Sequence, residues 1–448
     1  MILTGATLVT SLDPVRVERR DLHVADGRVV VDARGARRDC SGCLVLPGNV
    51  CAHTHLYSAL ARGMPYRLPP PETFVEILQR IWWRLDRALD EETVRASALV
   101  GGMEALLSGT TTLVDHHASP NAIDGSLDVI ADELGSLGVR SVLCYETSDR
   151  DGDARALAGV AENARFAGLV ERERPSLTRA LVGAHASFTL SDDTLAACVD
   201  AARAHRVGIH VHAAEDAADE TDAEALHGAR VAARLAAAGA LDEQTLLAHG
   251  VHLDDDEIAL VRDGGAQIVH NARSNMNNGI GRARVDALGP RVALGTDGIG
   301  SDMFEESRSA FFRLHDDGVG AGADWALTRL AEGARLAGRV FAEPAFGTLE
   351  PGAPADLVVL DYDAPAPLDD ESLAGHWIFG LSSRWVRDVM VAGEWVVLDR
   401  RLARLDQQEL VERARRQARR LWARVDEIEP HPFEPKGGRR WPSPLQTA

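Results

Sequence analysis

The feature that most constrains this chain is a set of metal-ligating side chains, each at or near the end of a short apolar run. His53 and His55 close the first of these runs, and His212 closes a second one far along the chain. His249 and Asp297 end two further runs in the same way. Because imidazole and carboxylate groups are ligands that zinc-like ions prefer, the set predicts a metal site built from distant parts of the sequence.

The spacing of these residues indicates a catalytic metal rather than a zinc finger. His53-x-His55 places both imidazoles on one side of an extended strand, because side chains alternate with period two. A zinc finger takes its ligands in close pairs, whereas His212, His249 and Asp297 lie far from His53-x-His55 and from one another in the sequence. A parallel barrel assembles its site in this way, with single residues from the C-terminal ends of several strands.

Alternating strand and helix patterns between residues 48 and 345 predict the barrel itself. Short apolar runs end in polar residues, and stretches with helical apolar spacing, such as Glu91–Ser108 and Asp192–Ala204, lie between them. The eight expected strands are Leu44–Ala52, Thr111–Val114, Ser141–Tyr145, Arg179–Ala184, Val207–Val211, Thr245–Ala248, Ala266–Val269 and Arg291–Thr296. Alternation of this kind implies parallel units, and eight of them imply an α/β fold of the (β/α)8 TIM-barrel type.

Strand-like sequence flanks the barrel region on both sides. Residues 1–47 contain short strands and turns, and strand-like runs return at Ala355–Asp361 and Val386–Leu398. We expect residues 1–47 and 346–405 to pair into one small composite β domain beside the barrel of residues 48–345. Residues 406–448 are expected to form a helix over 407–428, followed by a proline-containing tail that is poorly ordered or wraps around a partner.

Size, charge and cysteine content narrow the class of protein. The chain has 448 residues, of which 45% are hydrophobic, so it can fill a large core. Its formal net charge of −20 argues against binding to nucleic acid or to an anionic membrane. The sequence has no long apolar span and no signal-peptide pattern, so we expect a cytoplasmic protein. Cys40 and Cys43 form a lone C-x-x-C without a partner motif, which favours reduced, structural cysteines.

Longer motifs surround the metal-ligating residues. They are Leu46-Pro-Gly48, His212-x-x-Glu215, Leu247-Ala-His-Gly-Val-His252, Leu294-Gly-Thr-Asp-Gly298, and Gly347-x-Leu-x-Pro-Gly352 followed by Ala355-Asp-Leu-Val358. Together they resemble the amidohydrolase superfamily, in its metal-dependent aminohydrolase and chlorohydrolase branch, over nearly the whole chain. The stretches Trp82–Glu91, Asp115–Pro120, His270–Asn278 and Gly298–Glu306 are most similar to the SsnA-type aminohydrolases.

The resemblance implies a metal-binding role for four of these residues. His53, His55 and His212 would bind the metal through neutral imidazole nitrogens, and Asp297 would bind it more weakly. Two-metal hydrolases of this kind often bridge their metals with a modified lysine, but the only lysine here is Lys436, in the tail. We therefore expect one divalent metal per chain, with Zn2+ as the first choice and Fe2+ as the second.

The same resemblance assigns the proton chemistry. Asp297 would accept a proton from the metal's water, and Glu215 would carry a proton to a ring nitrogen and then to the leaving amine. His249 would hydrogen-bond the hydroxide generated at the metal, with direct ligation as the alternative. His116 and His117 end the second strand, and one of the two can reach the pocket.

Six further residues are candidates for substrate contact. They are His185, Arg150, Asn271, Arg273, Asp302 and Trp82. His185 occupies the place where relatives contact substrate, and Trp82 could stack on a planar ring. Asp302 stands where the better-understood purine and triazine deaminases commonly carry an asparagine. A carboxylate at that place predicts a substrate that presents hydrogen-bond donors.

These expectations define a metal-dependent hydrolase of non-peptide C–N bonds. The expected reaction is deamination of a planar, purine-like heterocyclic amine or amidine by hydroxide generated at the metal. One alternative is hydrolysis of a cyclic amide or of a carbon–halogen bond at the same site. The other is a catalytically silent, metal-bound scaffold, which would have no need of a proton shuttle such as Glu215. The expected partners are a small heterocyclic substrate and further copies of the same chain in a homo-oligomer.

Overall fold

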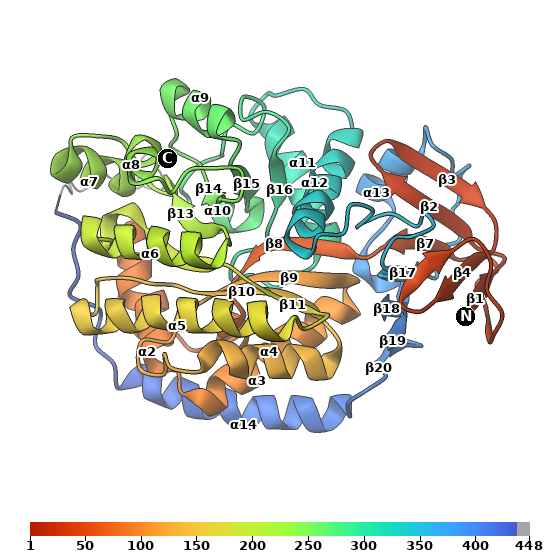
Figure 1. Ribbon diagram of the computed structural model, residues 1–448, viewed down its shortest axis with the longest axis horizontal. Coiled ribbons are helices and arrows are strands. Elements are labelled where there is room, and N and C mark those ends of the chain that lie inside the picture. Colours follow the sequence, from red (N-terminus) through yellow and green to blue (C-terminus); the bar gives the residue numbers. More distant parts are fainter. Residues whose placement is uncertain (437–448) are drawn as a thin grey trace.

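Parallel strands and surrounding helices form a (β/α)8 barrel in the computed structural model, which describes residues 1–436 (Figure 1). The barrel strands are β8 (Asn49–Thr54), β9 (Thr110–His117), β10 (Arg140–Tyr145), β11 (Thr178–Ala180) with β12 (Val182–Ala186), β13 (Ile209–Ala213), β14 (Leu246–His249), β15 (Gln267–His270) and β16 (Val292–Leu294). Strands β8 to β11 pair in sequence order, and so do strands β12 to β16. Isolated bridges join Thr147 to Ala184 and Thr54 to Asp297, and these bridges close the ring.

Helices follow the barrel strands and cover them from outside (Figure 1). They are α3 (Glu91–Leu107), α4 (Ser126–Leu137), α5 (Asp153–Glu173), α6 (Asp192–His205), α7 (Ala217–His227), α8 (Val231–Ala238), α9 (Asp255–Gly264), α10 (Ala272–Asn278), α11 (Met303–Asp316) and α12 (Asp324–Phe341). The helices expected over Glu91–Ser108 and Asp192–Ala204 are therefore present within one residue at each end. Both begin at a capping side chain, because Asp90 accepts from the amide of Thr93 and Ser191 accepts from the amide of Thr194.

The first expected strand, Leu44–Ala52, is two strands in the structure. Residues Leu44–Pro47 form β7, which pairs with β17 (Leu357–Leu360) outside the barrel, and β8 begins at Asn49. Gly48 lies at the break, where a Cβ would come within 2.2 Å of Thr111 Oγ1. The expectation of one continuous strand is thus corrected, because the chain leaves one sheet and enters the other at a residue that needs close backbone approach.

Strands from both ends of the chain form a separate β region beside the barrel (Figure 1). A seven-stranded sheet has the order β20 (Arg401–Leu402), β19 (Glu394–Leu398), β18 (Val386–Val391), β17, β7, β2 (Thr7–Leu12) and β3 (Val15–Arg19). A four-stranded sheet adds β5 (Arg28–Val30), β4 (Leu22–Ala25), β1 (Ile2–Thr4) and β6 (Arg37–Asp39). The expected pairing of N-terminal and C-terminal strands is confirmed, with β7 and β17 as the central antiparallel pair.

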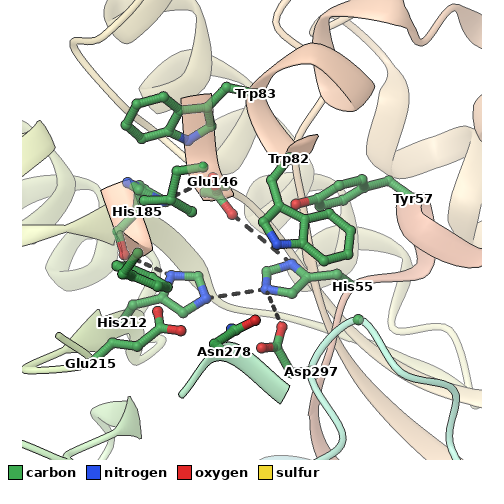
Figure 2. A pocket seen from close by; sticks show the side chains of 13 residues that line it. His55, Tyr57, Trp82, Trp83, Glu146, His185, His212, Glu215, Asn278 and Asp297 are labelled. Carbon is green, nitrogen blue, oxygen red and sulfur yellow. Dashed lines mark hydrogen bonds and ion pairs between the residues drawn. The ribbon is translucent and has the colours of Figure 1, made fainter. Parts of the chain in front are cut away.

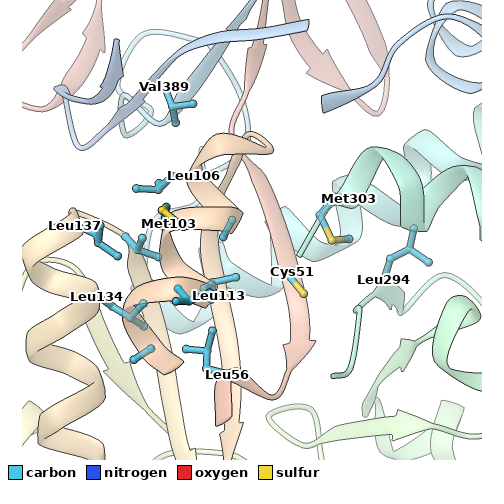
Figure 3. Close-up of a cluster of buried hydrophobic side chains, with 14 of the residues drawn as sticks. Cys51, Leu56, Met103, Leu106, Leu113, Leu134, Leu137, Leu294, Met303 and Val389 are labelled. Carbon is cyan, nitrogen blue, oxygen red and sulfur yellow. The ribbon is translucent and has the colours of Figure 1, made fainter. Parts of the chain in front are cut away.

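One hydrophobic core connects the barrel to the β region (Figure 3). Cys51 and Leu113 on the barrel strands pack with Leu106 of α3 and Met303 of α11 in this core. Val389, from β18 of the flanking sheet, belongs to the same cluster and is fully buried. Burial of a side chain of this size contributes about 1.5–3 kcal/mol, so the two regions stabilise each other.

The C-terminal segment packs along the outside of the barrel. Helix α14 (Gln407–Asp426) ends two residues before the expected boundary, and α13 (Leu373–Phe379) precedes the last strands. His431 is 5% exposed and donates its amide to the Gln79 carbonyl at 3.0 Å, so this part of the expected tail is bound to the barrel's own surface. Residues 437–448, where the rest of that tail prediction falls, lie outside the described residues.

Two further expectations concern cysteines and membranes. All five cysteines are buried and unpaired, and burial raises the pKa of Cys43 to about 11, so its thiol is a poor nucleophile. No helix between residues 1 and 436 combines the length and apolar character that a membrane span requires.

Deletion of residues 2–44 should give insoluble protein. The deletion removes β1 to β6 and the first residue of β7, so the rest of β7 loses its neighbour β2 and becomes an unpaired edge of the flanking sheet. Sedimentation of the truncated protein after expression checks this outcome, with the full chain as the control. A soluble truncation with the full chain's thermal unfolding midpoint would contradict the dependence of the barrel on the flanking sheet.

Candidate active site

The C-terminal ends of the barrel strands carry a ring of ionisable side chains. In strand order they are His53, Asp115 and His116, Glu146, His185, His212, His249, His270 and Asp297. His55, directly after β8, joins the same group, and Figure 2 shows it facing His212 and Asp297. The barrel therefore brings together residues that the sequence holds far apart, as its register requires.

Imidazole nitrogens and one carboxylate converge at the centre of this ring. His55 Nε2 lies 3.1 Å from His212 Nε2 and 3.2 Å from Asp297 Oδ1. His53 Nε2 lies 3.9 Å from the same Oδ1. In a tetrahedral zinc site, ligand atoms about 2.1 Å from the metal lie about 3.4 Å from one another, so these separations fit a shared metal.

The second nitrogen of each imidazole is already engaged. The Nδ1 contacts join His55 to the His116 carbonyl at 2.6 Å, His212 to the His185 carbonyl at 2.9 Å, His53 to His210 Nε2 at 2.9 Å, and His249 to Asn275 Oδ1 at 2.8 Å. A carbonyl only accepts, so His55 and His212 must donate from Nδ1 and keep an Nε2 lone pair. The buried Nε2 atoms of His53 and His249 have no hydrogen-bond partner among the described residues, which is the condition expected of metal-facing atoms.

Asp297 and His249 hold their positions through unusual backbone geometry. Asp297 has φ 52° and His249 has φ 75°, a left-handed region that side chains with a Cβ rarely adopt. The Asp297 carbonyl accepts from Thr54 Oγ1 at 3.0 Å, and its Oδ2 accepts from the Ser274 hydroxyl. These contacts fix the carboxylate so that Oδ1 faces His55.

Glu215 lies beside His249 and Asp297 on the pocket side. Its Oε2 is 3.6 Å from His249 Nε2, and His249 Nε2 is 3.9 Å from Asp297 Oδ2. Burial, together with the nearby Asp297 charge, raises the pKa of Glu215 well above its usual value. Burial lowers the pKa of His249 and keeps its ring neutral. This arrangement places a carboxyl group that can hold a proton next to a neutral imidazole and a second carboxylate.

A small cavity with an empty volume of about 450 Å³ opens above these groups (Figure 2). Its lining comprises His55, Tyr57, Phe74, Leu78, Trp82, Trp83, Glu146, His185, His212, Glu215, Asn278, Asp297 and Gly298. Trp82 ends η2 (Leu78–Trp82), a π-helical turn between α1 (Phe74–Ile77) and α2 (Trp83–Ala88). The irregular turn places Trp82 in the lining of the cavity, where a planar ring could stack on its indole.

Two of the six expected substrate contacts line this cavity, His185 and Trp82. Arg150 is buried behind the wall, where it pairs with Asp86 and lies 5.2 Å above the Trp83 ring. Its NH1 is 3.6 Å from Glu146 Oε1, so it acts on the pocket through two lining residues, Glu146 and Trp83. Arg150 is therefore placed as a buried support and not as a direct contact.

The other three expected contacts lie elsewhere. Asp302 caps α11, because its Oδ1 accepts from the amides of Phe304 and Glu305, and its Oδ2 accepts from Ser383. The expectation that Asp302 presents a carboxylate to substrate is corrected, since one of its oxygens caps α11 and the other accepts from Ser383.

Arg273 and Asn271 are also absent from the lining of the cavity. Arg273 donates to Glu306 at 2.6 Å and to the Gly300 carbonyl at 2.8 Å, so its charge is neutralised between α10 and α11. Asn271 is fully buried at the N-terminus of α10, with its amide nitrogen 3.4 Å from the Val269 carbonyl. Local sequence placed both residues after the right strand but could not give the direction of their side chains.

Glu146 is the main lining residue that the sequence motifs did not single out. It follows β10 directly, at the same end of the barrel as the histidines of the other strands. Its Oε2 lies 3.2 Å from His116 Nδ1, and the carboxylate is 4% exposed. The signal available in the sequence was its place after a barrel strand, since no motif marks it.

Comparison with known proteins identifies the class to which this fold and site belong. The model of the amidohydrolase family matches residues 44–396. The chain belongs to the amidohydrolase family. Its barrel, flanking sheet and histidine cluster are those of a metal-dependent hydrolase.

Individual relatives cover nearly the whole chain. A 5-methylthioadenosine/S-adenosylhomocysteine deaminase from Haloarcula marismortui is 32% identical and covers 95% of this chain and 99% of its own length. A 5′-deoxyadenosine deaminase from Methanopyrus kandleri is 30% identical and covers 88% of this chain and 93% of its own length. The crystal structure of an adenosine deaminase from Xanthomonas campestris with bound zinc superimposes with a TM-score of 0.81 at 25% identity. The match covers 94% of this chain and 98% of that structure's chain. The similarity thus extends over the barrel and the flanking sheet together.

Replacing a converging imidazole should remove the metal. In His212→Ala, the Nε2 atom that lies 3.1 Å from His55 Nε2 is lost, so the variant should retain less than about a tenth of the wild-type metal. Elemental analysis of folded, gel-filtered protein measures this. His205→Ala, at the end of α6 and outside the cluster, is the matched control and should keep its metal. Full metal retention in His212→Ala would contradict the ligand set.

Proposed function

We propose that this chain is a metal-dependent aminohydrolase that deaminates a purine-like heterocyclic amine. The observation that carries the proposal is the joint position of Glu215, His249 and Asp297, whose polar atoms lie within 4.8 Å of one another beside the converging imidazoles. The named activities of the two relatives, both deaminases of adenosine-type compounds, support the same reaction class. Within the family, the stretches at Trp82–Glu91 and Asp115–Pro120 support an SsnA-type subgroup.

One divalent metal per chain, Zn2+ before Fe2+, fits the donor set. His53, His55, His212 and Asp297 would hold it, and the unpartnered Nε2 of His53 is the clearest sign of that role. Such a metal supplies Lewis acidity and lowers the pKa of a water molecule toward neutrality. Lys436 is the only lysine and is exposed near the C-terminus, so no lysine side chain can bridge a second metal in the barrel.

The side chains divide the proton transfers among themselves. Asp297 takes a proton from the attacking water, while neutral His249 orients that water and stabilises the negative charge that develops. Glu215, whose pKa is raised by burial, donates a proton to the ring nitrogen next to the reacting carbon. Glu215 then takes the proton of the new hydroxyl group and passes it to the amine, so that the C–N bond breaks, ammonia leaves and a carbonyl forms. The proton held by Asp297 returns to Glu215 and restores both groups.

The pocket walls support a flat substrate. Trp82 and Tyr57 flank His55 in Figure 2, and Phe74 and Leu78 add apolar surface. Such walls favour a planar ring over an extended chain, because stacking requires flat faces. Glu215 and Asp297 line the same cavity beside His55 and His212, and the amine would face these groups.

Ammonia release from a panel of amino-heterocycles, measured on metal-loaded protein, tests the proposal. Wild type should release ammonia from at least one purine-like amine, and Glu215→Gln should lose about 100-fold or more in kcat while keeping its metal. Glu224→Gln, an exposed residue on α7, is the matched control and should keep wild-type kcat. Ring opening or halide release without ammonia would instead support the cyclic-amide or carbon–halogen alternative. A Glu215→Gln variant within a few-fold of wild type would contradict the assigned proton path.

A further inference from the structure

Glu146 and His185 present two hydrogen-bond acceptors side by side in the cavity wall. Glu146 Oε1 and His185 Nε2 lie 3.7 Å apart, and both residues line the cavity (Figure 2). Glu146 is 4% exposed and His185 is 5% exposed. Neither atom makes a hydrogen bond within the part of the chain that the structure describes, although both face the space that a substrate would fill.

The contacts of each residue fix which atom faces the cavity. Glu146 Oε2 is engaged by His116 Nδ1 at 3.2 Å, so Oε1 is left for the pocket. Arg150 NH1, 3.6 Å from Oε1, lies on the protein side and balances the carboxylate charge without a close hydrogen bond. A buried carboxylate oxygen with no donor is costly, so this arrangement is suited to a donor that arrives with the ligand.

The tautomer of His185 follows from Thr189. The Thr189 hydroxyl donates to the Ala186 carbonyl at 3.1 Å, so at its 2.6 Å contact with His185 Nδ1 it must accept. His185 therefore donates from Nδ1 and keeps a lone pair on Nε2. Both cavity-facing atoms of this pair are acceptors, and neither accepts a hydrogen bond from a donor in residues 1–436.

We propose that Glu146, together with His185, selects substrates that carry two neighbouring hydrogen-bond donors on the part of the molecule away from the reacting amine. Adjacent ring N–H and amino groups have this chemistry, and so do the two vicinal hydroxyls of a ribose. The inference rests on the proposed deaminase function. It assigns to Glu146 the recognition of substrate donors that the sequence led us to expect from Asp302. Asp302 cannot serve in this role, since it caps α11.

The position of Glu146 makes this selection separable from catalysis. Its nearest contact among the converging residues is His55 Nδ1 at 4.0 Å, and that nitrogen already donates to the His116 carbonyl. Glu215, on the other side of His212 in Figure 2, carries the proposed proton transfers. Replacing Glu146 should therefore alter the choice of ligand more than it alters the proton path.

Equilibrium binding to metal-loaded protein, followed by quenching of tryptophan fluorescence, tests the proposal. One pair of probes is guanine and hypoxanthine, which differ by a single amino group next to a ring N–H. The other pair is adenosine and 2′,3′-dideoxyadenosine, which differ by the vicinal hydroxyls. Wild type should prefer the donor-rich member of at least one pair by about 10-fold or more, and the pair that responds identifies the source of the donors.

Glu146→Gln should reduce that preference to within about 3-fold, because its amide can place N–H groups where an acceptor stood. Glu146→Asp, which keeps the charge beside His116 and Arg150 but withdraws the oxygen from the cavity, should reduce it as well and guards against a folding defect in the glutamine variant. Glu173→Gln, an exposed residue at the end of α5, is the control and should keep the wild-type preference.

The outcomes separate this inference from the proposed function. A wild-type protein without preference in either pair, or a preference that survives both Glu146 variants, would overturn the role of Glu146. A different result would overturn the deaminase proposal instead. In that case wild type releases no ammonia but shows the binding preference, and the Glu146 variants lose that preference, so Glu146 remains a recognition residue.

Discussion

The hydrogen bonds at the Nδ1 atoms of the barrel histidines are the interactions on which the rest of the site depends. His55 and His212 donate to backbone carbonyls of neighbouring strands, so their ring orientation follows directly from the register of the barrel. Their Nε2 lone pairs are thereby turned inward, 3.1 Å from each other. Two such atoms repel each other unless a cation stands between them, which makes a metal part of the stability of this centre.

The barrel also shifts the pKa values of two glutamates, Glu215 and Glu146, in opposite directions. Glu215 is buried beside Asp297, and its pKa is raised, so it can hold a proton. Glu146 is more deeply buried, which alone would raise its pKa, but the contact with His116 and the charge of Arg150 lower that pKa and keep the carboxylate ionised. Two glutamates within one cavity can therefore perform different tasks, one in proton transfer and one in recognition of donor groups.

The sequence allowed the barrel and the flanking sheet to be predicted, and it placed the candidate metal-binding residues at strand ends, because apolar periodicity and strand-end positions are local signals. The split at Gly48 could not be predicted, since it depends on the Thr111 side chain in a neighbouring strand. The capping position of Asp302 could not be predicted either. Its contact with Ser383 joins segments that are distant in sequence, so Asp302 was expected near substrate instead. The importance of Glu146 emerged only from the fold, which brings His116 and Arg150 to it. The metal stoichiometry, subunit count and cellular location remain predictions.

The most direct test of the central claim is anomalous diffraction at the zinc absorption edge, from crystals grown with zinc. The account predicts a single peak per chain, about 2.0–2.2 Å from the Nε2 atoms of His53, His55 and His212 and near the Asp297 carboxylate. A second peak of equal height would contradict the one-metal site. A peak at either of two neighbouring buried groups, His116 with Cys144 and His210, or Glu146 with His55, His116 and His212, would contradict the proposed ligand set.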